Sequence, residues 1–324
     1  MREAIAALPR SGLAPLELMH EAARTVSRVV PFDAASLVTM DPGTRLPTAH
    51  VAVGGPREIF GSLVANEIRT PDVNKFIEFG SGPVPVATLG SLSPAATERS
   101  PRVRQVLRPY GLRDELRVVF RAGGRWWGAA SLMRGHDLSY FTACERTFIA
   151  EVAADVGRAL REIVARHPAA EPEDEETAGP GVVVVDDGLT VLSTTQEAEL
   201  WRARAADDLA PALATSTLVA LAHPDGIATG RIRLAERGWL TLRAARLYGE
   251  SGRVAVTLQP ARYTDVTALL MHVRRLSVIE RSVTELHLRG LSEAAICTRL
   301  GISPAALREH LLSVFAKVGV AGPV

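Results

Sequence analysis

The chain of 324 residues contains few cysteines and few lysines: Cys144, Cys297, Lys75 and Lys317 are the only ones. Two cysteines in different regions define no disulfide framework, so we expect a reducing, cytoplasmic environment. No apolar run reaches the ~20 residues of a membrane-spanning helix, and the first residues lack the basic-then-apolar layout of a secretion signal. The sequence therefore predicts a cytoplasmic protein with no membrane partner.

Catalytic and metal-binding patterns are missing as well. The eight histidines and two cysteines show no HExxH and no Cys/His metal spacing, and no Ser/His/Asp set or phosphate-cradling Gly loop is found. Asp186, Asp187 and Asp225 stand at predicted turns, where aspartate is common, so a turn is favoured over a metal site. We expect no catalytic residue, no metal and no cofactor, and thus no enzyme.

The chain has enough apolar sequence to fold, and its charge is nearly balanced. Hydrophobic residues make up 47% and charged residues 23% of the chain, which excludes general disorder. The formal net charge of +1 does not indicate nucleic acid as a partner, so any DNA-binding charge must be local. The length suits two or three domains.

Residues 13–167 are predicted to form the first domain. Its helices are expected at 13–30, 56–68, 73–79 and 99–107, and its strands at 35–40, 48–53, 114–120 and 126–133. Residues 81–94 carry Pro83, Pro85 and Pro94 and are predicted to be a loop. Thr142 and Glu145 predict the cap of a long helix that ends near residue 165.

An acidic, proline-containing stretch at 168–180 is predicted to be a linker, and 181–262 to be a smaller second domain. A strand and its turn are expected at 181–188, further strands at 190–193, 230–234, 239–247 and 252–258, and helices at 196–206 and 209–221.

The last segment, 263–324, is predicted to be all helical. Ser277 and Glu280 form a capping-box pattern, and Gly290 is a typical helix stop. Ser292 and Ser303 are predicted N-caps of two further helices, with Gly301 as the tight turn between them. A short helix, a glycine turn and a capped helix indicate a helix-turn-helix, whose second helix usually lies in the DNA major groove.

The residues from 276 to 320 closely resemble the DNA-binding domain of LuxR-type transcriptional regulators. The resemblance rests on Leu-Ser-x-x-Glu-Arg from Leu276, Arg-Gly-Leu-Ser from Arg289, Ile-x-x-Arg-Leu-Gly-Ile-Ser from Ile296, and His-Leu-x-x-Val-Phe-x-Lys-Val-Gly-Val from His310. It implies that double-stranded DNA is the partner. The DNA-contacting residues that it implies are Ser303, Ala305, Arg308, Glu309, His310, Leu312 and Lys317.

Several of these positions depart from the family. Ala305 stands where the family is often basic, and Leu312 where it usually has a polar or basic residue. Arg308 matches a basic position and could bind guanine or phosphate. His310 is equally consistent with helix packing and with phosphate contact, and Cys297 is expected to pack. The departures weaken the expected DNA affinity but leave the apolar face of the helix intact.

The first two domains also resemble known sensor modules. Tyr110-Gly-Leu-Arg-Asp-Glu-Leu-Arg-Val-Val-Phe, followed by Gly-Gly-Arg-Trp-Trp-Gly-Ala and Phe141-Thr-x-x-Glu, resembles the GAF-like sensory half of actinobacterial-style LuxR regulators. Two strands, helices and three strands in 181–262 resemble a small PAS-like domain. These resemblances imply a possible small-molecule ligand, although the sequence assigns no ligand-binding residue.

Three features are candidate ligand sites. The arginines at 99, 102, 104 and 108 could meet an anion, but a solvated basic face is favoured. Trp126 and Trp127 are expected on opposite faces of a strand, one in the core and the other packed, lining a pocket or on a partner surface, with packing favoured. No paired histidine or acid is assigned to activate Cys144, so a redox or cofactor-linking role is not expected.

The predicted fold class is α+β, with a GAF-like domain at 13–167, a PAS-like domain at 181–262 and a C-terminal all-α helix-turn-helix domain at 263–324. The sequence leaves little room for the family's fourth, dimerising helix, so the helices at 13–30 and 148–163 are expected to pack together and to carry a homodimer contact. The predicted function is a ligand-responsive, DNA-binding transcriptional regulator. The alternative is a signalling sensor or scaffold with a weakened DNA-binding domain.

Overall fold

The computed structural model describes residues 5, 13–55, 59–166, 179–205, 209–234, 238–249, 252–261, 271, 273–274 and 276–318. The chain divides into an N-terminal unit, Met1–Ala261, and a C-terminal unit, Arg262–Val324. The N-terminal unit holds two five-stranded antiparallel sheets, and the C-terminal unit is helical. This confirms the predicted α+β class. Within the described ranges, no helix is both long and apolar enough to cross a bilayer.

The first sheet follows the expected order of elements but has longer strands. Its strand order is β2-β1-β5-β4-β3, and every neighbouring pair is antiparallel. The strands are β1 (Ala34–Met40), β2 (Pro47–Gly54), β3 (Val86–Thr88), β4 (Leu112–Ala122) and β5 (Arg125–Gly135). Gly123 and Gly124, both with positive φ, form the predicted hairpin turn between β4 and β5.

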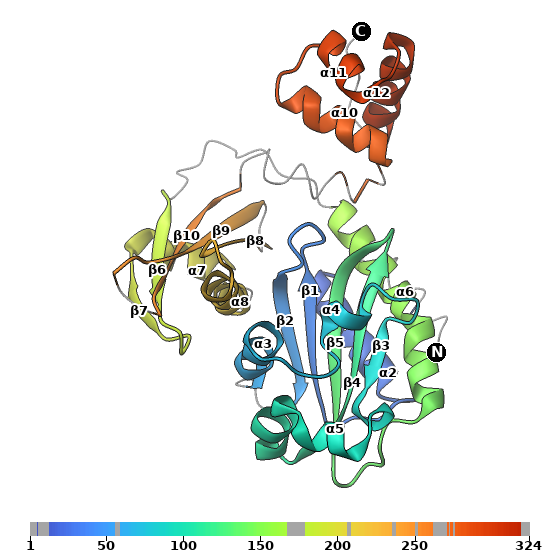
Figure 1. Cartoon of the computed structure of the whole chain (residues 1–324), viewed down its shortest axis with the longest axis vertical. Helices are drawn as coiled ribbons and strands as arrows, with labels where there is room; N and C mark the ends of the chain where they lie inside the picture. The colour runs from blue at the N-terminus through green and yellow to red at the C-terminus, as the bar shows by residue number, and fades with distance from the viewer. Residues whose placement is uncertain are drawn as a thin grey trace. The chain divides into compact units, whose positions relative to one another are not determined.

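Helices cover both faces of this sheet (Figure 1). On one face lie α2 (Pro15–Val26) and α6 (Ala143–Arg166), which contact each other as expected. Over the other face lie α3 (Ile59–Arg69) and α4 (Phe76–Phe79). The predicted cap of α6 is present, because Glu145 N–H donates to Thr142 Oγ1 over 3.2 Å and Thr142 N–H donates to the Glu145 carboxylate over 2.8 Å.

The region between α4 and β4 differs from the prediction. The expected loop at 81–94 contains the edge strand β3, which pairs Val86 with Val118, and the short helix η2 (Leu89–Ser91). The expected helix at 99–107 is present only in part, because the chain is helical from Pro101 to Leu107 but breaks at Ser100. Pro101 disfavours helical backbone at Ser100, so the chain forms α5 (Pro94–Arg99) and, after that break, the π-helix η3 (Arg102–Leu107) and η4 (Arg108–Tyr110).

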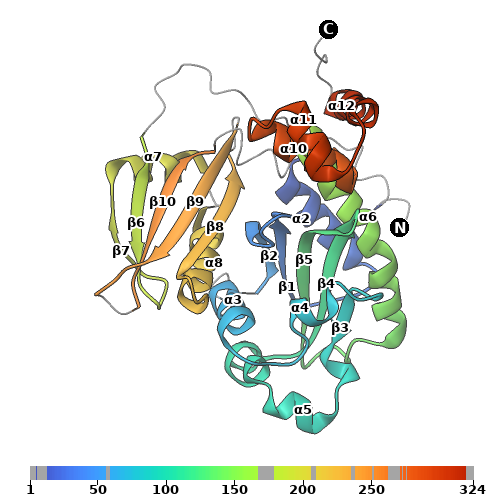
Figure 2. The same ribbon diagram turned by 45° about the horizontal axis from the view of Figure 1, so that its top comes forward.

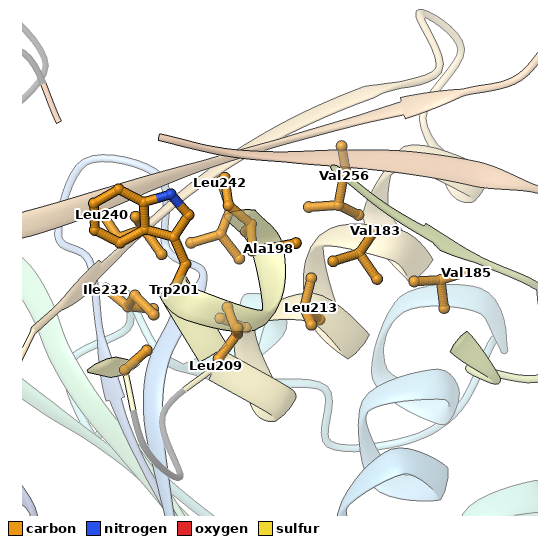
Figure 3. Close-up of a cluster of buried hydrophobic side chains, with 14 of the residues drawn as sticks. Val183, Val185, Ala198, Trp201, Leu209, Leu213, Ile232, Leu240, Leu242 and Val256 are labelled. Carbon is orange, nitrogen blue, oxygen red and sulfur yellow. The ribbon is translucent and has the colours of Figure 1, made fainter. Parts of the chain in front are cut away.

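The second sheet has the order β7-β6-β10-β9-β8. Its strands are β6 (Gly181–Val185), β7 (Val191–Thr194), β8 (Ile227–Arg233), β9 (Trp239–Arg246) and β10 (Val254–Pro260). Two helices, α7 (Gln196–Ala205) and α8 (Leu209–Ala222), pack on one face. Figure 3 shows the core between them, where Trp201 lies near Leu240 and Leu242 and all three are buried. That this domain is PAS-like stays a prediction, and most of the predicted linker at 168–180 lies outside the described residues.

The C-terminal unit is built from α10 (Val278–Leu288), α11 (Glu293–Leu300) and α12 (Pro304–Val318), and Figure 2 shows these three helices. The predicted caps are all present. Ser277 and Glu280 form the capping box, and Ser292 and Ser303 accept from the backbone N–H three residues on. Val283, Leu286, Ile296 and Leu307 make the shared core, against which Cys297 packs as predicted.

Gly301 is the conformationally special residue of the α11–α12 turn. Its φ is +65°, and a Cβ at this position would meet nothing within 4 Å. The cost of Gly301→Ala is therefore backbone strain alone, and we expect about 1 kcal/mol lower stability of the C-terminal unit. Amide hydrogen exchange of peptides from 276–318 measures this. Gly301→Asn should cost less, because asparagine tolerates left-handed backbone, and equal losses for the two variants would contradict the strain argument.

Candidate functional site

A cavity of about 220 Å³ lies over the first sheet. Its floor is β1 and β5, and its walls come from α3, α4 and the loop that joins β1 to β2. Small residues leave the space open, because Ala129 and Ser131 lie on the cavity face in the middle of β5. Most of the lining is apolar, with Val38, Phe60, Val64 and Phe76 among its members.

A register shift in the β4–β5 hairpin turns Trp126 toward this cavity. Phe120 pairs with Gly128 but Arg121 pairs with Trp126, so Trp127 is the extra residue of a bulge. Trp126 consequently lines the cavity, whereas the buried Trp127 donates its indole N–H to the Ala122 carbonyl over 3.0 Å. Of the alternatives weighed from the sequence, the structure therefore selects a pocket position for Trp126.

One row of polar side chains crosses the cavity floor. Ser36, Ser131 and Arg117 are register partners on β1, β5 and β4, and all three line the cavity. The Ser36 hydroxyl lies 3.0 Å from His50 Nε2, and Arg117 donates to the Glu67 carboxylate over 2.9 Å. Ser131 is 4% exposed, and its hydroxyl has no hydrogen-bond partner among the residues that the structure describes.

Beside the cavity lies a buried ion cluster that corrects the expected basic face. Arg102 is fully buried, and its Nε lies 2.8 Å from Glu115 Oε2, whose carboxylate is also fully buried. Arg117 Nε lies 3.7 Å from the other oxygen of Glu115. Burial, and then the nearby Arg102 charge, lower the pKa of Arg117 below its usual value. Arg99, Arg104 and Arg108 are exposed as expected, and Arg108 pairs with Glu98.

The second sheet completes the cavity through α8. Thr215 and Val219 of this helix are part of the lining. Leu218 belongs to the same buried cluster as Val38, Phe60, Val64 and Ala129 of the first sheet. Figures 1 and 2 both show α8 beside α3. The site is therefore assembled from two sheets that the sequence places in separate domains.

A buried ion pair joins the two sheets near this wall. Asp41, in the loop after β1, is 2% exposed and Arg231 of β8 is 8% exposed. Arg231 Nε donates to Asp41 Oδ2 over 2.5 Å, and Nη2 donates to Asp41 Oδ1 over 2.9 Å. Such a two-bond geometry fixes orientation as well as distance.

The second candidate surface is the exposed face of α12. Ala305, Arg308, Glu309 and Leu312 are exposed, Ser303 is exposed at the N-cap, and His310 is partly buried. Leu312 is 63% exposed, an apolar side chain on a solvent-facing helix surface. The four exposed side chains follow helical spacing, so α12 presents them together. Their role in DNA contact stays a prediction.

Lys317, the last predicted contact, has a protein partner. Its ammonium donates to both carboxylate oxygens of Glu280 over 2.7 Å, and Ser313 Oγ donates to Glu280 Oε1 over 2.6 Å. Burial would raise the pKa of Glu280, but the bonds from Lys317, Ser313 and Ser277 outweigh it and lower the pKa to about 2. The Lys317 charge is thus largely compensated within the unit.

Sequence reasoning missed the cavity, the ion cluster and the Asp41–Arg231 pair. Two signals were present. Glu115 and Arg117 alternate within a predicted strand, which places both on one face of the sheet. The segment 209–222 carries no charged residue, and a helix that is apolar all round is buried on more than one side. In the described part of the chain, no group of three metal-ligating side chains is gathered.

No protein-family model and no curated protein matches the chain. Among solved structures, Escherichia coli SdiA is 12% identical, covering 99% of this chain and 91% of its own, with a TM-score of 0.41. A GAF domain/HD domain protein from Geobacter sulfurreducens is 14% identical, covering 47% and 95%, with a TM-score of 0.35. The GAF domain of a phosphoenolpyruvate-protein phosphotransferase from Coxiella burnetii is 14% identical, covering 51% and 93%, with a TM-score of 0.33. All three TM-scores lie below 0.5, so these likenesses carry no argument about function.

Proposed function

We propose that this chain is a non-enzymatic, DNA-binding transcriptional regulator that responds to a small molecule through its N-terminal unit. The main observation behind this proposal is the structure of the C-terminal unit. Three helices begin at Ser277, Ser292 and Ser303, a left-handed glycine joins the last two, and α12 presents an exposed row that includes Arg308. This is the arrangement in which a second helix enters the major groove. The cavity supports the sensing half of the proposal.

The proposed mechanism is a population shift. A bound ligand favours one arrangement of the sensor domains in a homodimer, and that arrangement sets whether two C-terminal units meet half-sites about one helical turn apart. The homodimer is part of the proposal. Its candidate contact surfaces are α2 and α6.

Selection of bound duplexes from a random DNA library tests the proposal, with full-length protein at two salt concentrations. We expect enrichment of an inverted repeat with half-sites about 10 bp apart. Salt-sensitive binding without any enriched sequence would reduce the function to phosphate contact. No binding at either salt concentration, with or without a cavity ligand, would reject the proposal.

The second candidate is a sensor or scaffold whose DNA-binding domain is weakened. Three observations favour it: Leu312 is exposed on α12, Glu309 places a negative charge on the same face, and Lys317 is engaged by Glu280. Glu309 and the pairing of Lys317 lower the positive charge available to DNA phosphates, and Leu312 adds none.

A charge-adding variant separates the two candidates. Leu312→Lys should raise DNA affinity about threefold to tenfold and steepen the dependence of log affinity on log salt by about 0.9, because one more phosphate is neutralised. Leu288→Lys is the matched control, since Leu288 is also an exposed apolar residue of the unit but lies on α10. Binding that appears only in Leu312→Lys would favour the weakened domain, and equal gains from both variants would mean that α12 is not the DNA-facing helix.

A further inference from the structure

The residues that line the cavity over the first sheet define the chemistry of its ligand. We propose that it binds an uncharged, mostly apolar molecule with one hydrogen-bonding group, and that α8 is an essential wall, so the ligand binds only while the two sheets are docked. This inference rests on the proposed sensing function. It adds the class of the ligand and identifies α8 as the helix that couples ligand binding to docking of the two sheets.

The two charged residues at the cavity floor are already paired with each other, which disfavours an ionic ligand there. Arg117 and Glu67 both line the cavity, but they bind each other over 2.9 Å, and Arg117 also donates to the Asn74 carbonyl over 2.8 Å. A buried ligand charge would therefore find no free counter-charge there, and an uncompensated buried charge is strongly unfavourable. The exposed Arg45 stacks over Trp126, with its guanidinium carbon 4.9 Å from the ring centroid.

One polar group on the floor lacks a partner. The Ser131 hydroxyl lies in the same row as Ser36 and Arg117, whose polar atoms are bonded to His50 and Glu67. The Ser131 hydroxyl lines the cavity, has no hydrogen-bond partner within the described part of the chain and is not among the enclosed, unsatisfied atoms. A ligand hydroxyl, carbonyl or amide placed against Ser131 would make a hydrogen bond that the apolar lining does not offer. Around it, Val38, Ala129 and Phe60 offer only apolar contact.

The remaining wall belongs to the second sheet. The helix α8 contributes Leu209, Ala212 and Ala220 to the core of its own domain and Leu218 to the cluster on the first sheet. Its residues Thr215 and Val219 face the cavity. If α8 moved away, this side of the cavity would open to water and the apolar ligand would lose buried area. Binding therefore favours the docked arrangement, and docking favours binding.

The Asp41–Arg231 pair holds the docked arrangement in place. Both side chains are buried, and the Asp41 carboxylate also accepts from the Gly43 N–H over 2.7 Å, which fixes the β1–β2 loop. Loss of the Arg231 charge would leave the Asp41 carboxylate buried without its cation, a state that separation of the sheets would relieve by hydration. The ion pair is thus a positioning element for the cavity and does not contact the ligand.

Fluorescence titration of the full-length protein with N-phenyl-1-naphthylamine tests the proposal, with 2-naphthol and 2-naphthoate as competitors. We expect saturable one-to-one binding of the probe. Uncharged 2-naphthol should displace it, and the anion 2-naphthoate should do so about tenfold more weakly or not at all. Ser131→Ala should weaken 2-naphthol about fivefold while leaving naphthalene unchanged. Equal competition by the neutral and charged naphthalenes would overturn the ligand class.

Two α8 variants test whether this helix forms a wall of the cavity. Val219→Trp should fill the cavity and weaken the probe by about tenfold or more, whereas Ala222→Trp, at an exposed position on the same helix, should change affinity by less than about twofold. Arg231→Met should weaken the probe about tenfold without touching the cavity. In the wild type, the probe should slow amide hydrogen exchange in α8. Full affinity in both Val219→Trp and Arg231→Met would overturn the composite site, and so would the absence of probe binding.

The DNA selection tests the function of the C-terminal unit, and the probe titration tests the cavity of the N-terminal unit. A protein that selects an operator but binds no uncharged naphthalene refutes this inference alone. A protein that binds the probe through α8 but never binds DNA refutes the proposed regulator and leaves the composite site standing.

Discussion

Replacing Glu115 with glutamine should lower the free energy of unfolding of the N-terminal unit by about 3–5 kcal/mol. The variant removes the negative charge that faces Arg102 at 2.8 Å, while both side chains are fully buried. Arg102 keeps its bond to the Val73 carbonyl at 2.9 Å, but that neutral acceptor does not replace a carboxylate. Urea unfolding followed by tryptophan fluorescence measures the loss, because all four tryptophans lie in this unit.

An exposed ion pair on the same domain provides the matched control. Glu98→Gln removes the partner of Arg108, and these side chains are 61% and 46% exposed, so the variant should cost less than about 1 kcal/mol. The double variant Arg102→Met, Glu115→Gln should be more stable than Glu115→Gln alone, because it removes the stranded charge. A double variant that loses the full sum of the two single losses would show that the pair is not coupled.

Replacing Glu280 with glutamine should destabilise the C-terminal unit by about 2 kcal/mol at pH 7. The lowering of the pKa from 4.5 to about 2 corresponds to about 3 kcal/mol, and the solvent around Lys317, which is 37% exposed, reduces this figure. Glutamine at this position keeps the capping box with Ser277. The variant therefore removes the charge interaction and retains the cap. Amide hydrogen exchange of peptides from 276–318 in the full-length protein measures the difference.

The stability lost in Glu280→Gln should become smaller as the pH falls. The folded-state pKa of Glu280 is below its unfolded value, so the stabilisation is complete above about pH 4.5 and disappears as the pH falls through about 2. The difference between wild type and Glu280→Gln should shrink over that window. Glu285→Gln, an exposed position on the same helix, should have little effect at any pH. A gap between wild type and Glu280→Gln that stays constant down to pH 2 would argue against the Lys317 interaction.

Local signals in the sequence were sufficient wherever a few neighbouring residues decide the structure. The three caps and the two glycine turns of the C-terminal unit appear where Ser277, Ser292, Ser303, Gly290 and Gly301 predict them. Each is a hydrogen bond or a backbone conformation set within about four residues. The hairpin at Gly123–Gly124 and the cap of α6 are of the same kind. The α5–η3 break was not predicted, because the expected helix began at Arg99, although Pro101 disfavours helical backbone at Ser100.

What the sequence determined alone is most of the strands and helices of the N-terminal unit and a capped three-helix end with a family-like surface. Only the tertiary structure decided which charged side chains pair in the interior and where a cavity remains. Arg102 and Glu115 are 13 positions apart, and Asp41 and Arg231 are 190 apart. No local pattern joins either pair, because burial and pairing of charges depend on which faces pack together. The cavity has the same origin: small residues on β5 leave the room, a bulge turns Trp126 into it, and an uncharged helix from another domain closes it.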